Sequence, residues 1–213
     1  MAPSMKLTYF DLPGLGEPVR LALAQSGVEW EDNIINFDDW LALKPATPLG
    51  QLPVLEVDGV LIPQSLAQLR YVGKIGGLYP TDPIQAAFCD AAADACTDVF
   101  GPMRNSYEEK DEKKKASHCY LLSLSHALAL WHLYRWLAKM EKVLESAGGM
   151  YFAGGKLSIG DIAVVARLNW IKTGTLEDIP PTIVDGSSLL SSLVERVMAE
   201  PKIAAYMKSR TKK

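Results

Sequence analysis

Short apolar runs between turn residues predict a β-sheet in the first third of the chain. Four such runs have the length and the β-branched or aromatic content of strands: residues 6–10, 30–35, 54–57 and 60–62. The last two flank Asp58-Gly59, a dipeptide that favours the positive φ angles of a tight hairpin turn. Helical spacing occurs over residues 17–26, in a short irregular stretch over 38–43, and again from Ser65. This order predicts an α/β unit with a mixed four-stranded sheet, in which a right-handed crossover comes first and a hairpin last.

Helical spacing alone continues after residue 83. Residues 74–83 are rich in Gly and Pro and lack periodicity, so we predict a linker there. Beyond it we predict helices over residues 84–107, 117–146, 158–168, 189–198 and 201–208. The third begins with a capping-box pair, Ser158 and Asp161, ahead of an almost wholly apolar run, which predicts the buried central helix. The chain is thus predicted to divide into an α/β domain over 1–76 and an all-α domain over 84–213.

The composition is typical of a globular protein. Of the 213 residues, 48% are apolar and 22% are charged, and the net charge of −3 offers no electrostatic attraction to nucleic acid or to an anionic membrane. No apolar run approaches the ~18 residues of a membrane span, and the first residues lack the apolar core of a signal peptide. We therefore expect a cytoplasmic protein whose partners include neither nucleic acid nor a membrane.

The cysteines and histidines give no indication of a metal site. Cys89 and Cys96 lie in one predicted helix, roughly 10 Å apart along its axis, which is too far for a disulfide. The spacing of His118, His126 and His132 to the cysteines fits no metal site. We expect buried or interface thiols in a reducing compartment, and no metal.

Residues 50–71 carry the first candidate site. Pro53 would remove a ladder hydrogen bond inside a strand, so it belongs at the start of one, where a bend or a cis bond can present the backbone of Leu52. Ser65 occupies the predicted N-cap of the next helix, whose free amides and positive dipole end suit a carboxylate or a phosphate. The pair could hold a peptide-like acid. An ordinary hairpin followed by a capped helix is the alternative.

Four motifs in this part of the chain, in order, resemble those of the cytosolic glutathione S-transferases. They are LTYF at residues 7–10, GQLP at 50–53, VDG at 57–59, and the pair Gln64-Ser65. The capping box at 158–161 is similar to one in the helical half of that family. The resemblance implies a thioredoxin-like domain followed by an all-helical one. Trp40 and Lys44, with Gln64-Ser65, place the chain closest to the tyrosine-type enzymes of the sigma class.

The resemblance also implies where glutathione, the co-substrate, binds. Tyr9 would be the catalytic residue, donating a hydrogen bond from its hydroxyl to the glutathione sulfur. The backbone of Leu52, before a cis Pro53, would pair with the cysteinyl part, while Gln64 and Ser65 would hold the γ-glutamyl carboxylate. The remaining contacts would come from Trp40, Lys44 and Gln51 at the glycyl end, and from Asp98 of the other subunit of a homodimer at the γ-glutamyl amine.

The second substrate that the resemblance implies is a small hydrophobic electrophile. Its pocket would draw on Phe10, Leu15, Met103, Asn105 and Tyr107, most of them apolar. The implied reaction is conjugation of glutathione to such electrophiles, with reduction of organic hydroperoxides by the same thiolate. The alternatives are a glutathione-dependent isomerase like prostaglandin D synthase, and a non-catalytic ligand-binding or structural member of the fold.

Two positions depart from the sigma-class pattern. Leu15 stands where these enzymes often carry an arginine, which removes a candidate thiolate-stabilising charge and argues against prostaglandin isomerisation. Gln68 stands where they usually carry an isoleucine.

An acidic series follows one face of the first long helix. Asp90, Asp94 and Asp98 recur at i, i+4 and i+8, which places them side by side. For Asp90 and Asp94 we expect a solvated face, whereas the resemblance gives Asp98 its role in the other subunit.

Overall fold

The computed structural model describes residues 3–107, 119–176 and 179–210, with the side chains of residues 100–129 excluded. In that part of the chain no helix is long and apolar enough to cross a membrane. The described His, Cys, Asp and Glu side chains likewise form no group of three that could hold a metal ion.

The N-terminal part contains a mixed sheet of four strands, as predicted. The strands are β1 (Met5–Phe10), β2 (Glu31–Ile35), β3 (Val54–Val57) and β4 (Val60–Ile62), in the order β2-β1-β3-β4. β1 runs parallel to β2 and antiparallel to β3, and β3 and β4 form the predicted hairpin. Leu7 and Leu55, paired across β1 and β3, are both fully buried and anchor the sheet in the core.

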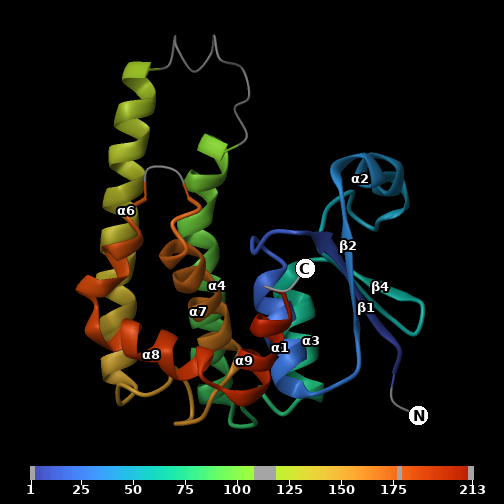
Figure 1. Cartoon of the computed structure of the whole chain (residues 1–213). Helices are drawn as coiled ribbons and strands as arrows, with labels where there is room; N and C mark the ends of the chain where they lie inside the picture. The colour runs from blue at the N-terminus through green and yellow to red at the C-terminus, as the bar shows by residue number, and fades with distance from the viewer. Residues whose placement is uncertain (1–2, 108–118, 177–178, 211–213) are drawn as a thin grey trace.

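Two helices lie between the sheet and the rest of the molecule. They are α1 (Glu17–Ser26) and α3 (Ser65–Ile75), which pack on each other (Figure 1). α1 ends as predicted at Gly27, whose φ of 72° is the left-handed conformation that suits glycine. The short α2 (Phe37–Leu43) and the 3₁₀ turn η1 (Lys44–Ala46) fill the segment between β2 and β3. α3 runs past residue 74, so the connection to the next helix is shorter than predicted.

Helices make up the rest of the described chain. They are α4 (Pro83–Tyr107), α6 (Cys119–Ser146), α7 (Ile159–Lys172), η2 (Pro181–Gly186), α8 (Ser188–Met198) and α9 (Pro201–Arg210). α7 contacts α1, α4 and α8 and is buried along most of its length, which confirms the prediction of a central helix. The fold class is therefore the predicted one, a mixed-sheet α/β part followed by a helical part. The exact division at residues 76 and 84 stays a prediction.

The start of α7 is fixed by one buried carboxylate. Asp161 is fully buried and accepts hydrogen bonds from the Ser158 amide at 2.8 Å, the Ser158 hydroxyl at 2.7 Å and the Phe152 amide at 2.8 Å. Burial raises the pKa of Asp161 to about 6, although the hydrogen bonds act in the opposite direction. The predicted capping box is therefore present, and its Asp also holds the loop before the helix.

An ion-pair cluster joins α3 to α4. Arg70 donates from Nε to Asp90 and from Nη2 to Asp94, each at 2.6 Å, and the Tyr79 hydroxyl donates to Asp90 at 2.7 Å. The hydrogen bond to Asp90 raises the pKa of Tyr79 to about 12. The expectation of a solvated face is therefore wrong for Asp90 and only partly right for the more exposed Asp94. Asp90 and Asp94 lie one turn apart on α4, so a single guanidinium can bind both carboxylates. The sequence pattern did not indicate that this guanidinium belongs to Arg70 of α3.

Replacing Arg70 by Met is expected to lower the free energy of unfolding by about 1 kcal/mol, because the lost ion pairs are partly exposed. Screening should shrink this loss in urea titrations at 1 M NaCl. Lys172→Met, which breaks a single pair with Asp185 inside the helical part, is the matched control and should change stability less. An Arg70 effect that does not depend on salt would mean that packing, not charge, is responsible.

Candidate functional site

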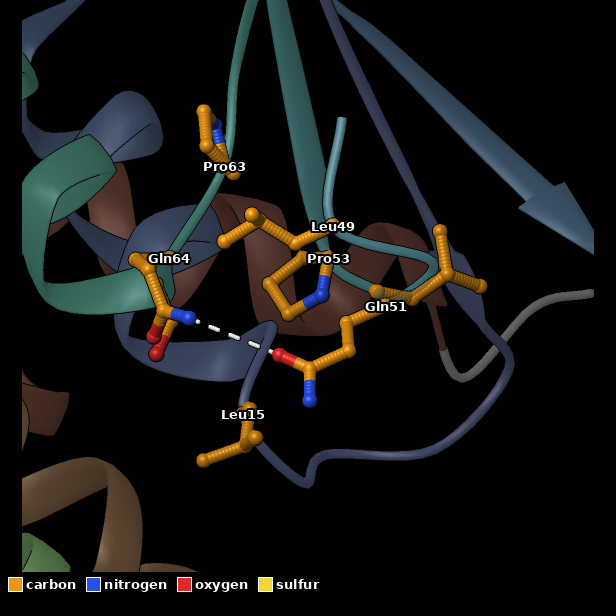
Figure 2. Close-up of a pocket in the computed structure, with 8 residues that line it drawn as sticks. Leu15, Leu49, Gln51, Pro53, Pro63 and Gln64 are labelled. Atoms are coloured by element: carbon orange, nitrogen blue, oxygen red, sulfur yellow. Dashed lines mark hydrogen bonds between the residues drawn. The ribbon is translucent and has the colours of Figure 1, made fainter. Parts of the chain in front are cut away.

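A recess beside the sheet lies where three loops meet. It is open to solvent, and Figure 2 shows the residues that line it. Its lining comes from the β1–α1 loop, the segment before β3 and the β4–α3 connection, namely Leu15, Leu49, Gln51, Leu52, Pro53, Pro63, Gln64 and Ser65. Five residues of the predicted glutathione set thus lie together with one of the predicted electrophile set. Leu49 and Pro63 were not predicted, because nothing in their local pattern separates them from ordinary turn residues.

The start of α3 differs by one residue from the prediction. Gln64, not Ser65, is the N-cap, since its carbonyl accepts the first hydrogen bond of the helix from the Gln68 amide at 3.0 Å. Gln64 has a φ of 69°, an unusual conformation for a residue with a side chain, and its side chain points toward Gln51 (Figure 2). Ser65 is the first residue of the helix. Both residues line the recess, so α3, whose first-turn amides have no acceptor within the helix, begins beside it.

Gln68 connects the two sides of the recess from behind. Its side chain is fully buried, and Nε2 donates to the carbonyls of Pro53 and Ile62, both at 2.8 Å. The peptide bond between Leu52 and Pro53 is cis, in agreement with the expectation from the family. Gln68, which stands where sigma-class enzymes usually carry an isoleucine, therefore joins the backbone before β3 to the end of β4. An isoleucine could not donate to either carbonyl.

Tyr9 lies on β1, and its hydroxyl contacts Leu15, one of the residues that line the recess. It is 7% exposed, and its hydroxyl oxygen accepts a hydrogen bond from the amide of Leu15 at 3.0 Å. The ring packs against Gly16, where an added Cβ would lie 2.5 Å from Cδ1 of Tyr9, so only glycine allows this approach. A hydroxyl that accepts one hydrogen bond can also donate one. The contact places the hydroxyl next to Leu15, which lines the recess.

Two buried arginines hold the β1–α1 loop, and neither was predicted. Arg20 of α1 forms a salt bridge with Asp32 at 3.0 Å and donates to the carbonyls of Phe10 and Leu12, each at 3.0 Å. Arg167 of α7 donates from Nη1 to the carbonyl of Gly14 at 2.8 Å. The available signal for Arg167 was an arginine inside the apolar run of α7, but no local pattern identifies its partner.

Trp40 and Lys44 lie beside the recess and do not line it. Trp40 is 9% exposed, and its ring meets that of Phe10 edge-on, with 6.4 Å between centroids. Lys44 is exposed, and its Nζ lies 6.0 Å from the centre of the Trp40 ring. Trp40 and Lys44 are therefore joined to β1 through Phe10, the neighbour of Tyr9.

The rest of the predicted site is further away or outside the described side chains. Asp98 is exposed on α4 and does not line the recess. The side chains of Met103, Asn105 and Tyr107 lie outside the described residues. A second, larger hollow lies between the β1–α1 loop and the helices α7 and α9, with Pro13, Trp170 and Met207 among its lining.

The described cysteines are unsuited to act as nucleophiles. Cys89 and Cys96 are free and buried, which confirms the expectation of buried thiols. Burial raises the pKa of the Cys89 thiol, and that of Cys96 to about 12, so both stay protonated at neutral pH. Neither Cys89 nor Cys96 can therefore supply a reactive thiolate to the recess, whereas a bound thiol compound could.

Comparisons with known proteins agree with this architecture. The family model described as "Glutathione S-transferase, N-terminal domain" matches residues 5–74, and that described as "Glutathione S-transferase, C-terminal domain" matches residues 97–210. Glutathione S-transferase 1 of Ascaris suum is 35% identical over 99% of this chain and 98% of its own. Hematopoietic prostaglandin D synthase of Gallus gallus is 32% identical over 99% and 98%.

The solved structures show the same similarity in three dimensions. Prostaglandin synthase D of Nilaparvata lugens superimposes with a TM-score of 0.80 at 34% identity, over 98% of each chain. Both parts of this chain, the sheet with its recess and the helical part behind it, are thus matched by known relatives along nearly their whole length. The chain belongs to the glutathione S-transferase family and is a glutathione transferase.

Proposed function

We propose that the recess binds glutathione and that Tyr9 activates its thiol for conjugation to small hydrophobic electrophiles. One observation carries the proposal: Leu15, whose amide donates to the Tyr9 hydroxyl, lines a recess that also contains the start of α3 and the backbone before Pro53. A helix start can bind a carboxylate, and an exposed backbone segment can pair with a peptide. Glutathione carries both groups, with a thiol between them.

The proposed orientation of glutathione follows from these groups. The γ-glutamyl carboxylate meets Gln64, Ser65 and the first-turn amides of α3, and the cysteinyl part meets the backbone of Leu52. The glycyl carboxylate extends toward Gln51, Trp40 and Lys44. The ammonium group of Lys44 supplies a positive charge for it. The thiol then lies near Tyr9, and Leu15 presents an apolar surface to the electrophile.

We also propose that the chain forms a homodimer in the cytoplasm. Asp98 of a second copy is then available to the γ-glutamyl amine, since it is exposed on α4. Ile84 and Phe88 on the same helix are 65% and 51% exposed, which suits an interface that covers them. Free buried thiols at Cys89 and Cys96 suit a reducing compartment. Assignment to the sigma class rests on Trp40, Lys44 and the Gln64-Ser65 pair.

One hydrogen bond from Tyr9 is strong enough to account for activation of the glutathione thiol. A free cysteine thiol has a pKa of about 8.5, so only a few per cent is thiolate at neutral pH. A hydrogen bond to a charged group contributes about 1.5–3 kcal/mol, and about 1.4 kcal/mol corresponds to one pKa unit. Donation from Tyr9 to the thiolate would therefore lower the thiol pKa by about one to two units, which makes thiolate a major species near neutrality.

A glutathione-dependent isomerase is the second candidate. It is favoured by the similarity to relatives named prostaglandin D synthase. The same thiolate would add to the substrate and leave again, so glutathione would be recovered unchanged, whereas conjugation consumes it. Reduction of organic hydroperoxides by the thiolate would instead produce oxidised glutathione. Measuring which form of glutathione leaves the enzyme separates the three reactions.

The proposal is tested by retention on immobilised glutathione together with conjugation of a chloro-nitro-aromatic substrate. We expect both for the wild-type chain. Ser65→Ala should raise the KM for glutathione about tenfold with little change in kcat, because one hydrogen bond to the carboxylate is lost in ground and transition states alike. The control is Ser26→Ala, whose hydroxyl bonds to Leu23 at the far end of α1. Retention without turnover would favour a non-catalytic carrier, and loss of both would refute the proposal.

A further inference from the structure

Arg167 is a charge placed deep between the two parts of the molecule. It belongs to the apolar central helix α7, whose neighbouring residues Val164, Val165, Ala166 and Leu168 are also buried, and it is only 5% exposed. A buried guanidinium is stabilised where its donors find acceptors. One donor of Arg167 meets this condition on the β1–α1 loop, since Nη1 donates to the carbonyl of Gly14 at 2.8 Å.

The acceptor of Arg167 and the donor to Tyr9 belong to one peptide group. The carbonyl of Gly14 and the amide of Leu15 are the two ends of the same planar unit. That amide donates to the hydroxyl oxygen of Tyr9 at 3.0 Å. Guanidinium, peptide and phenol thus form an unbroken series of two hydrogen bonds, which links α7 to the candidate catalytic hydroxyl.

A cation at one end of such a series changes the other end. Drawing electron density toward the carbonyl makes the amide hydrogen more positive, and hydrogen bonds in a row strengthen one another in a medium of low dielectric constant. Burial lowers the pKa of Arg167, while its interactions with Cys96 and with Tyr9 act in the opposite direction. A second cation, Arg20, lies 5.5 Å from the centre of the Tyr9 ring and is the same in every Arg167 variant. The guanidinium nevertheless stays charged, because its pKa starts far above neutrality.

We propose that Arg167 is a positioning residue that polarises the Gly14–Leu15 peptide, so that the Leu15 amide binds the Tyr9 oxygen more strongly and Tyr9 becomes a better hydrogen-bond donor to the glutathione sulfur. The second half of this statement rests on the proposed function. The first half concerns Tyr9 alone. It holds whether or not glutathione is the ligand, so the two can fail separately.

The test is the titration of Tyr9 in protein labelled with ¹³C at the tyrosine ring carbon that bears the hydroxyl. The Tyr9 signal is identified by its loss in Tyr9→Phe. In Arg167→Met we expect the pKa of Tyr9 to rise by about one unit relative to wild type, because a nearby cation favours the phenolate. Arg167→Lys should restore most of the wild-type value, and Arg167→Gln, which keeps a donor but no charge, should fall between Met and wild type.

Arg196→Met is the matched control. Arg196 also donates from Nη1 to a main-chain carbonyl at 2.8 Å, that of Met150, but this contact lies within the helical part. It should leave the Tyr9 titration unchanged. If Arg167→Met does not fold, Arg167→Gln and Arg167→Lys carry the comparison. A Tyr9 pKa that is the same in folded Gln, Lys and wild-type proteins would overturn the proposal.

A second readout concerns glutathione itself. Thiolate absorbance of the bound ligand gives its pKa, which should rise by about half a unit to one unit in Arg167→Gln, while the Kd for glutathione changes less than twofold. A normal thiol pKa already in the wild-type complex would refute the proposed activation of glutathione but leave the Tyr9 result standing. A large loss of affinity with no change in either pKa would reduce Arg167 to a structural role.

Discussion

Replacing Tyr9 by Phe is expected to lower kcat for conjugation at least tenfold, while the Kd for glutathione changes less than twofold. The substitution removes the hydroxyl that the Leu15 amide holds at the recess and leaves the ring that packs on Gly16. A lost hydrogen bond to a thiolate, about 1.5–3 kcal/mol, corresponds to roughly ten- to a hundredfold in rate. The affinity for glutathione is expected to change little, because the proposed binding contacts are made by other residues, among them Ser65, Leu52 and Gln51. Stopped-flow conjugation assays and fluorescence titration with glutathione measure the two quantities.

The same variant should displace the pH profile. If Tyr9 favours the thiolate, the acid limb of kcat/KM moves upward by about one to two pH units in Tyr9→Phe, since the thiol then ionises nearer its ordinary pKa. Tyr134→Phe is the control, because Tyr134 is 57% exposed on α6. Unchanged turnover and an unchanged profile in Tyr9→Phe would remove this residue from the catalytic role.

Replacing Asp161 by Ala is expected to lower the free energy of unfolding by about 2–4 kcal/mol at neutral pH, a large share of a typical domain's total. Three donors, the two amides and the Ser158 hydroxyl, would lose their acceptor in a buried place. Asp185→Ala is the control, since that carboxylate is more than half exposed and accepts from a single lysine. Urea unfolding followed by circular dichroism measures both. An Asp161 effect no larger than that of Asp185 would contradict the capping role.

The Asp161 effect should also depend on pH. Because burial raises its pKa to about 6 from 3.8, the folded protein binds a proton there in a range where the unfolded chain has released it. This group's contribution to stability is therefore greatest at low pH and declines as the pH rises from about 4 to 6. The difference between wild type and Asp161→Ala should accordingly be larger at pH 5 than at pH 7. The opposite trend would mean that the hydrogen bonds outweigh burial.

Local patterns were sufficient for much of the fold. The hairpin at Asp58-Gly59, the helix end at Gly27 and the capping box at Ser158 each depend on residues a few positions apart, so their physics is visible in the sequence. For the recess, local patterns indicated only Leu52, Pro53 and Ser65. The family resemblance added Leu15, Gln51 and Gln64, and Leu49 and Pro63 were missed. The start of α3 was placed one residue late, because Ser is a common N-cap whereas Gln64 takes that position only with a positive φ.

Contacts between distant segments could not be predicted. Arg70 meets Asp90 and Asp94 twenty or more residues along the chain, and Arg167 meets Gly14 over a separation of 153 residues. A polar residue in an apolar run indicates that some partner exists, but only the packing of helices decides which one. The apolar pocket for the electrophile was named from the family, and its α4 side chains Met103, Asn105 and Tyr107 stay a prediction.

Gln68 has a consequence for how mutational data on this protein will be interpreted. Its single carboxamide ties Ile62, the last residue of β4, to Pro53, the residue before β3, so α3 is linked to both strands of the hairpin. Any substitution that loosens the inner side of α3, at Leu69 or Val72 for example, shifts the recess even though neither side chain reaches it. In a mutational scan that measures only ligand affinity, these buried core positions will therefore be mistaken for binding residues.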